Sequence, residues 1–365
     1  MIFADTRAEK WQSREERMTI ALKEIAVKNI LTKSNLPVAD YSANPYVGCV
    51  HACRYCYASF MKRFANHPEP WGTFVDVKQW PPLPQPEKFS GKEIFCSSVT
   101  DPYQPPEKHY RRTRALLEQM QGSGCSISIA TKSDLVLRDL DIIKTFPGAR
   151  VSWSINTLDS AFQRDMDRAV SIERRFAAMK AFHEAGVRTT CFISPIFPGI
   201  TDPCAIIRRA KNQCNLVWLE NLNLRGGFKK DILDYIAARY PALSGLYEGI
   251  YVRGDKGYWT EMDAELRAFS RKEGLPYVRD DDSLQRPFAA PPVVVNYFFH
   301  EEIIPSAKNT KSWRRPLKAA RYGQKIPKIP DSSPAVPTGI TKDRCPEAPR
   351  AGQCARRTRR DQRRR

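Results

Sequence analysis

The sequence lacks long hydrophobic runs, and none of its 365 residues lies in a stretch approaching the roughly 18 apolar residues of a membrane-spanning helix. Residues 1–17 mix acids with bases and lack the apolar centre of a secretory signal peptide. The sequence also lacks an internal repeat beyond the strand–helix rhythm described below. We therefore expect a cytoplasmic protein with no membrane partner.

Acidic residues are scarce near the C-terminus. Residues 306–365 hold 18 Lys and Arg against 4 Asp and Glu, which is +14 of the total charge of +19. Pro, Ser, Lys and Arg dominate there and regular periodicity fades, which predicts a disordered tail. Such a tail would attract phosphates through counterion release. The alternatives are a solvated tail without a partner and a tail with no selected role.

Strand-like runs alternate with helical runs through the middle of the chain. This order predicts an α/β fold with a parallel sheet and right-handed crossovers. The predicted strands are Tyr41–Val47, Glu93–Ser98, Cys125–Thr131, Val151–Ile155, Val187–Ile193 and Asn215–Glu220. The predicted helices are Glu107–Gln121, Asp134–Thr145, Ser160–Ala185, Asp202–Gln213, Phe228–Arg239 and Glu261–Glu273.

Three other parts complete the predicted organisation. An N-terminal extension, 1–40, begins with charged helical sequence and continues as an extended lead-in, and a core runs from 41 to 300 before the tail at 306–365. Six prolines between residues 68 and 86 predict that 58–90 is an irregular surface loop. The β-rich run Val293–Phe299 reads as an added edge strand.

Ten cysteines in a chain without a secretory signal favour metal ligation or reactive thiols over disulfides. Cys49, Cys53 and Cys56 stand in a C-x3-C-x2-C spacing within residues 48–56, the cysteine loop. Closely spaced thiolates can bind one iron–sulfur cluster together. Three cysteine ligands are one fewer than a cubane cluster takes, so one iron would be left without a protein ligand. The alternative is a structural zinc site that adds His51, although zinc ligands usually come in two separated pairs.

The cysteine loop and the residues around it resemble the radical S-adenosylmethionine (SAM) superfamily. Asn44-Pro45-Tyr46 before the loop and Tyr55-Cys56-Tyr57-Ala58 at its end resemble the branch of spore photoproduct lyase and DNA repair photolyase-like proteins. This resemblance implies a partial (βα)6 barrel and a 4Fe-4S cluster whose open iron chelates SAM. It also implies that the reduced cluster cleaves SAM to methionine and a 5′-deoxyadenosyl radical.

Polar residues gather where the predicted strands end, which is where sites lie in parallel α/β sheets. Ser154 and Asn156 share one face of the fourth strand by its period of two. By the resemblance, Lys132 and Ser154 are SAM contacts, and Thr100 is a further candidate. Tyr55 would shelter the adenine and pass hydrogen, and Tyr57 would lie near the radical path.

The second strand departs from the spore photoproduct lyase pattern. In that enzyme a cysteine on this strand donates hydrogen to the product radical, and the matching residue here is Ser98. A serine O–H bond is a poor hydrogen donor to a carbon radical. Cys96, two residues earlier on the same strand face, is a candidate substitute. Its alternative role is that of a small buried hydrophobe, and the thymine-dimer substrate is therefore in doubt.

The remaining candidates receive structural interpretations. Cys125 and Cys191 are expected in the core, Cys204 and Cys214 flank a helix without a partner motif, and Cys345 and Cys354 lie in the tail. A second cluster built from Cys204, Cys214 and others is disfavoured. The run at 300–302, His-Glu-Glu, is expected to be a surface turn rather than a metal site.

These observations predict a radical SAM enzyme of lyase or repair type. The resemblance implies a DNA or RNA substrate and an electron donor such as flavodoxin or ferredoxin. Two alternatives stay open. One is a radical SAM enzyme that acts on a peptide or small molecule, which the absent thiol at Ser98 supports. The other is a non-enzymatic, metal-bound nucleic-acid-binding protein.

Overall fold

The computed structural model describes residues 20–36, 39–224, 226–279 and 293–298. All of them belong to the first of two compact units, Met1–Ser312. The predicted helical start of the chain, the run at 300–302 and the basic tail lie outside the described residues. No helix among the described residues is long and apolar enough to cross a membrane.

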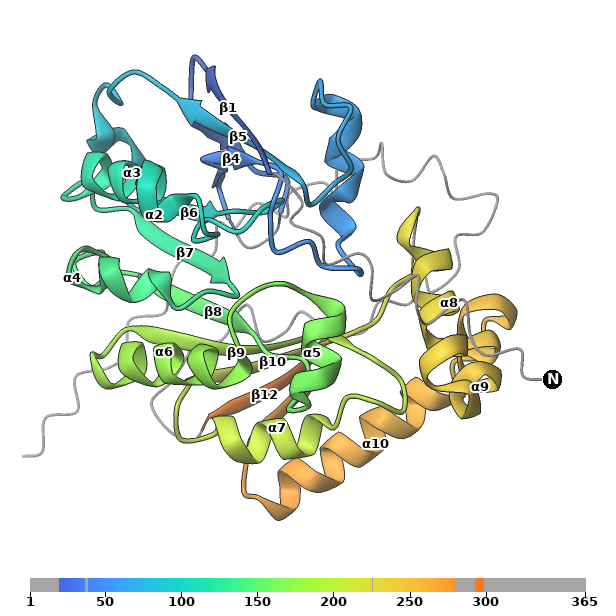
Figure 1. Cartoon of the computed structure of the whole chain (residues 1–365). Helices are drawn as coiled ribbons and strands as arrows, with labels where there is room; N and C mark the ends of the chain where they lie inside the picture. The colour runs from blue at the N-terminus through green and yellow to red at the C-terminus, as the bar shows by residue number, and fades with distance from the viewer. Residues whose placement is uncertain (1–19, 37–38, 225, 280–292, 299–365) are drawn as a thin grey trace, which may run out of the picture. The chain divides into compact units, whose positions relative to one another are not determined.

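A nine-stranded sheet forms the centre of this unit (Figure 1), in the order β11-β12-β10-β9-β8-β7-β6-β3-β2. Every neighbouring pair is parallel except β2 with β3. Its strands are β2 Leu31–Lys33, β3 Tyr41–Ala43, β6 Glu93–Cys96, β7 Ser126–Thr131, β8 Arg150–Ser154, β9 Arg188–Ile196, β10 Leu216–Asn221, β11 Tyr277–Arg279 and β12 Val294–Phe298. Five of the six predicted strands and the parallel α/β class are confirmed. The first, Tyr41–Val47, is wrong as a single strand, because it divides into β3 in this sheet and β4, Tyr46–Val47, in a second sheet. Closure into a partial barrel stays a prediction.

Helices follow the strands along the chain, mainly in the predicted places. They are α2 Glu107–Tyr110, α3 Arg112–Met120, α4 Leu140–Ile143, α5 Ser160–Met166, α6 Ile172–Glu184, α7 Pro203–Ala210, α8 Phe228–Arg239, α9 Ser244–Glu248 and α10 Gly257–Lys272. Three predicted helices are each split in two, and the first half of Asp134–Thr145 is the 3-10 helix η4, Leu135–Asp139. Arg111 has a left-handed backbone, with φ of 50°, between α2 and α3. Asp167 is extended after α5, and its side chain has partners that are described below.

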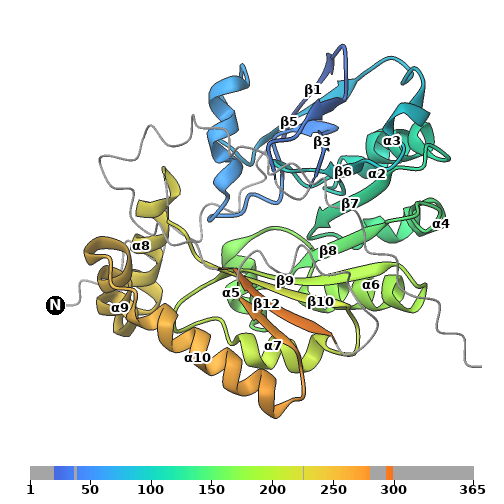
Figure 2. The same ribbon diagram turned by 180° about the vertical axis from the view of Figure 1, so that it is seen from behind.

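The two faces of the sheet differ in burial. α6 packs on β8 and β9, and α7 packs on β9, as Figure 1 shows. Val151 and Trp153 of β8 and Val217 of β10 are fully buried, whereas the alternate residues Ser152 and Trp218 are half-buried. The opposite face is turned to the viewer in Figure 2. Every second residue of these strands is therefore apolar and packs into the core beneath the helices. Burying each large apolar side chain stabilises the fold by about 1.5–3 kcal/mol.

The prediction of an irregular loop over residues 58–90 is wrong for its middle. Phe74–Gln79 forms β5, which pairs with β1, Ala21–Ala26, and with β4, Tyr46–Val47, in a separate three-stranded sheet. Phe74 is fully buried within it. The prolines flank this strand without interrupting it, so its backbone N–H groups stay available for pairing.

The prediction of an edge strand at Val293–Phe299 is wrong in its position. β12 pairs with β10 on one side and with β11 on the other, so β11 lies at the edge. β11 has only three residues, too few for a period-two pattern to show. Residue 299 lies outside the described residues.

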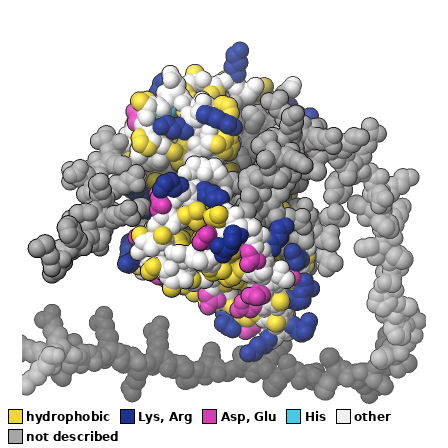
Figure 3. Space-filling model, turned by 90° about the vertical axis from the view of Figure 1, so that its right-hand side faces the viewer, with side chains coloured by type: hydrophobic (Ala, Val, Ile, Leu, Met, Phe, Trp, Pro, Cys, Tyr) yellow, Lys and Arg dark blue, Asp and Glu magenta, His cyan; other side chains and the backbone are white. Residues whose placement is uncertain are grey.

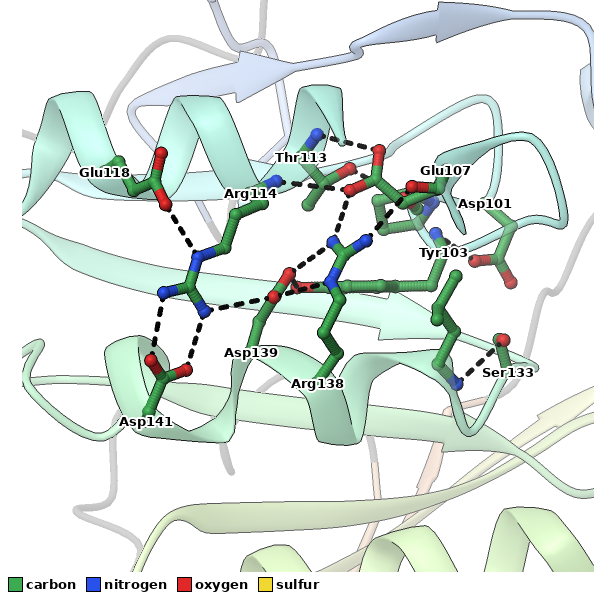
Figure 4. Close-up of polar contacts among 12 residues, drawn as sticks. Asp101, Tyr103, Glu107, Thr113, Arg114, Glu118, Ser133, Arg138, Asp139 and Asp141 are labelled. Carbon is green, nitrogen blue, oxygen red and sulfur yellow. Dashed lines mark hydrogen bonds and ion pairs between the residues drawn. The ribbon is translucent and has the colours of Figure 1, made fainter. Parts of the chain in front are cut away.

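Glu107, at the start of α2, is a fully buried carboxylate that joins the three-stranded sheet to the helical segments after β6 and β7. It accepts hydrogen bonds from the Thr113 backbone N–H at 3.0 Å, from Arg138 Nη2 at 2.6 Å and from the Tyr46 hydroxyl of β4. Figure 4 shows Arg138 between Glu107 and Asp139. A buried charge with this many donors is costly to leave unpaired.

Replacing Glu107 by Gln should lower the free energy of unfolding by about 2–3 kcal/mol, because the charged acceptor of these donors is lost. The control is Glu118→Gln, which removes a largely exposed ion pair with Arg114 at 2.8 Å and should cost about 0.5 kcal/mol. Urea unfolding measures both. Equal effects would show that Glu107 has no special structural role.

Candidate active site

The cysteine loop leaves β4 through Gly48, whose backbone is held from two directions. Its carbonyl accepts hydrogen bonds from Thr100 Oγ1 at 2.8 Å and from Gln104 Nε2 at 3.1 Å. Gln104 also accepts from the Val50 N–H at 3.0 Å. Gly48 has φ of +87°, and a Cβ there would lie 2.2 Å from the Phe74 carbonyl oxygen. Only glycine therefore fits where the loop begins.

Asp101, which follows β6, ties the cysteine loop to the end of β7. Its buried carboxylate accepts hydrogen bonds from Thr131 Oγ1 at 2.8 Å, from the Lys132 N–H at 2.7 Å and from the Tyr103 N–H at 2.9 Å. His51 Nε2 lies 3.1 Å from the same carboxylate. Burial alone would raise the pKa of Asp101, but His51 and these donors outweigh it and lower the pKa.

A second buried carboxylate, Asp167, holds the loop from the other side. It lies 2.6 Å from Arg175 Nη2, which is itself fully buried, and accepts a hydrogen bond from Gln163 at 2.9 Å. Burial would raise the pKa of Asp167, but Arg175 and Lys132 outweigh it and lower the pKa. Two backbone hydrogen bonds beside it reach the loop, from Arg54 N to Met166 O at 3.0 Å and from Arg168 N to His51 O at 2.8 Å.

The three cysteines of the loop are free thiols in one small region. Burial, together with Asp101 and Cys56, raises the pKa of Cys49 to about 12. Burial raises the pKa of Cys53 while Lys132 opposes the rise, and burial raises that of Cys56 while the Trp71 indole opposes it. The thiols hold their protons at neutral pH, so loading a metal centre would release protons.

His51, the fourth ligand of the alternative zinc site, is paired with Asp101. Within the described residues no three His, Cys, Asp or Glu side chains form a group arranged to hold a single metal ion. The contact between His51 and the Asp101 carboxylate instead gives the imidazole a structural role in the loop.

Lys132 lies beside Tyr55 of the cysteine loop. Its ammonium nitrogen is 5.6 Å from the centre of the Tyr55 ring, a cation–π contact. Burial would lower the pKa of Lys132, but Tyr55, Cys53 and Asp167 outweigh it and raise the pKa. Lys132 is therefore a fixed positive charge beside the cysteines. The Tyr55 hydroxyl donates to Asp167 at 3.5 Å, and its ring packs edge-on against Phe197 at 5.6 Å.

Ser154 and Asn156 lie at the end of β8 and are both buried. The Ser154 carbonyl accepts from Arg175 at 3.1 Å, and the Asn156 carbonyl accepts from Thr201 Oγ1 at 2.8 Å. The Asn156 side-chain nitrogen is buried without a hydrogen-bond partner. Such an orphaned donor normally has a partner, and a hydroxyl- and carboxylate-bearing ligand such as SAM would supply one.

The other predicted residues lie around this group. Thr100 donates to Gly48 and accepts from Gln104, so its hydroxyl braces the loop. Tyr57 donates to the carbonyl of Ser98, whose hydroxyl accepts from Asn44 at 3.4 Å. Cys96 is fully buried in the main core. Burial, with Cys125 and Glu93, raises the pKa of its thiol to about 12. The roles assigned to all these residues stay predictions.

Sequence reasoning missed the residues that hold the site together. Asp101 and Gln104 lie in the same run as Thr100, and Asp101 follows the last residue of β6, Cys96, by five residues. A carboxylate this close to a strand end was a usable sign of a site residue. The sequence carries no sign of the role of Asp167 and Arg175, because an Asp and an Arg in a helical stretch are normally expected to be solvent-exposed. Their burial follows from the break between α5 and α6.

Replacing Gly48 by Ala should lower the free energy of unfolding by about 3 kcal/mol or more, because its Cβ would strike backbone at a left-handed φ. The matched control is Gly122→Ala, where φ is +77° but nothing lies within 4 Å. That change should cost only about 1 kcal/mol. Thermal unfolding of both proteins measures the difference, and similar losses would contradict the close approach at Gly48.

Replacing Asp101 by Asn should lower the free energy of unfolding by about 2–4 kcal/mol, because a charged acceptor of four groups is lost. The loop should also hold less iron after anaerobic loading. Asp134→Asn is the control, since it removes only the ion pair with exposed Arg174 at 2.6 Å and should cost about 0.5 kcal/mol. Chemical unfolding and iron analysis measure both; an Asp101→Asn protein with normal stability and iron content would refute this role.

Comparison with known proteins places this geometry in a family. Residues 43–207 match the model of the radical SAM superfamily. An uncharacterized protein of Methanocaldococcus jannaschii is 37% identical over 224 residues, which cover 61% of this chain and 85% of that protein. An uncharacterized protein of Mycobacterium tuberculosis is 28% identical over 257 residues, covering 64% and 75% of the two chains.

Two solved structures show more distant similarity. A spore photoproduct lyase variant with bound AdoMet and dinucleoside spore photoproduct has 16% identity and a TM-score of 0.44, covering 60% of this chain and 66% of that chain. Streptococcus suis SuiB bound to S-adenosylmethionine has 14% identity and a TM-score of 0.37, covering 66% and 55%. The family model carries the assignment: this chain belongs to the radical SAM superfamily, whose model matches residues 43–207.

Proposed function

We propose that this chain is a radical SAM enzyme that holds a 4Fe-4S cluster on Cys49, Cys53 and Cys56 and acts on a nucleic-acid substrate. The observation that carries the proposal is the grouping of three loop thiols with the charged Lys132 after β7, while the unpartnered amide of Asn156 follows the neighbouring strand β8. Members of the superfamily usually bind such a cluster and SAM. Closure of the sheet into a partial barrel and a cytoplasmic location belong to the same proposal.

The donor set fits both groups. Three thiols match a cubane with one open iron. Lys132 is a buried ammonium that would bind the anionic carboxylate of SAM, and Asn156 would donate to its polar atoms. When bound, the cluster and SAM supply a carbon radical that abstracts hydrogen from the substrate.

The chain's own residues then have three tasks. Asp167 stabilises the charge of Lys132, and its buried ion pair with Arg175 keeps that carboxylate in place. Tyr55, packed on Phe197, forms an apolar wall beside Lys132 that excludes water. Tyr57 has its hydroxyl anchored on Ser98 and its ring exposed, so it faces an incoming substrate, whereas Cys96 is enclosed in the core.

A second candidate function is radical chemistry on a peptide or small molecule. It is favoured by the absence of an accessible thiol at this strand end, where Ser98 stands and Cys96 is fully buried. This candidate predicts that DNA and RNA leave activity unchanged. The non-enzymatic zinc alternative is disfavoured by the pairing of His51 with Asp101.

Each of Cys49→Ala, Cys53→Ala and Cys56→Ala should abolish formation of 5′-deoxyadenosine and lower bound iron, because two thiolates hold the cluster poorly. The assay loads the protein anaerobically with iron and sulfide, reduces it with SAM present and detects deoxyadenosine by chromatography. Cys204→Ala, in α7, is the control and should retain activity. Activity that survives any loop substitution would refute the assigned ligands.

A further inference from the structure

The segment directly after the cysteine loop exposes aromatic rings. Residues Tyr57–Phe64 form the 3-10 helix η2, which begins beside Cys56. Tyr57, Phe60 and Phe64 are 63%, 43% and 68% exposed. In the described part of the chain, these three are the only exposed large aromatic side chains. An exposed aromatic cluster on one short element marks a binding surface, because such rings usually contribute to cores.

Positive charge accompanies these rings. The Arg63 guanidinium carbon lies 5.4 Å from the centre of the Phe60 ring and 4.7 Å from that of Phe64. Lys62 precedes it and donates to the Pro68 carbonyl at 3.4 Å, and η2 contains no acidic residue. Hydrophobic and basic side chains lie together on the upper part of the face in Figure 3, the side on which Figure 1 places this segment.

The rings follow one another at intervals of three and four residues. With a rise of about 2.0 Å per residue, successive rings are about 6–8 Å apart along the helix axis. Nucleobases stack on aromatic rings and on guanidinium planes, and their phosphates bind cations. The rings and cations of this one short helix can therefore serve the bases and the phosphates of an unpaired strand.

We propose that η2 is a stacking platform for an unpaired stretch of nucleic acid, with bases on Phe60 and Phe64 and phosphates on Lys62 and Arg63. The inference rests on the proposed function and deepens it by naming the substrate class. The platform is continuous with the site, because Tyr57 is both its first ring and the residue anchored on Ser98. A strand lying along η2 brings a nucleotide to the end of β6, beside the cysteine loop.

An acidic protein partner would also meet cations here, but the contacts of Arg63 favour nucleic acid. Protein interfaces carry a packed apolar centre with charges at the rim, whereas on η2 the guanidinium contacts two rings directly. That arrangement presents separate flat surfaces, each the width of a base. A duplex would need to unpair or flip a nucleotide before it could use them.

Binding of a fluorescein-labelled 12-mer of oligothymidylate to the full-length protein tests the platform by fluorescence anisotropy over a series of salt concentrations. The tail residues bind through charge, so their contribution falls steeply with salt, whereas stacking does not. The double variant Phe60→Leu/Phe64→Leu should weaken binding by about tenfold per ring at high salt. The slope of log affinity against log salt should stay unchanged.

The matched controls separate ring stacking from apolarity and charge. Phe60→Tyr/Phe64→Tyr keeps both rings and should bind within about twofold of the unaltered protein. Val252→Ala, at an apolar residue 56% exposed elsewhere on the surface, should have no effect. Lys62→Ala and Arg63→Ala should each reduce the salt slope by about 0.7. Because the altered rings are exposed, unchanged thermal unfolding verifies that the variants fold.

Two results would overturn the proposal. One is a leucine double variant that binds as tightly as the unaltered protein at every salt concentration. The other is an unaltered protein that does not bind the oligonucleotide at high salt but binds an acidic flavodoxin through Phe60 and Phe64. The proposed function is judged separately by SAM cleavage without substrate, so loss of ring-dependent binding with intact deoxyadenosine formation rejects the platform alone.

Discussion

The site depends on one buried negative charge, the carboxylate of Asp101. It follows β6 and joins the cysteine loop, through His51, to the end of β7, through Thr131 and Lys132. A buried carboxylate is stable only with donors around it, so these segments must meet for the chain to fold. The pairing of His51 fixes the loop between Cys49 and Cys53 in place.

Asp167 is a second buried carboxylate that needs partners, and it lies on the opposite side of the cysteine loop from Asp101. Its ion pair with Arg175 is buried, and Arg175 also donates to the carbonyls of Val170 and Ser154. Lys132 lies between these two carboxylates, with its N–H bound to Asp101 and its charge facing Asp167. The fold therefore places a positive charge beside the thiols before any cofactor arrives, which limits rearrangement on binding.

The sequence predicted the sheet well because the period-two and helical patterns are long and apolar. The prediction failed for short strands and for strands next to prolines. β5 was hidden by flanking prolines, and β11 has too few residues to show alternation. The cysteines, Lys132 and Ser154 were identified through resemblance and strand-end position. Asp167 and Arg175 could not be, because their importance comes from a helix break and from burial, which local sequence does not encode.

The central claim is that three cysteines hold a cluster with one iron open to SAM. Electron paramagnetic resonance of the anaerobically loaded, reduced protein, before and after addition of SAM, tests it most directly. The account predicts the signal of a reduced 4Fe-4S cluster that changes shape when SAM is added, because SAM then coordinates the open iron. A cluster signal that SAM leaves unchanged, or protein that retains zinc and no iron, would contradict it.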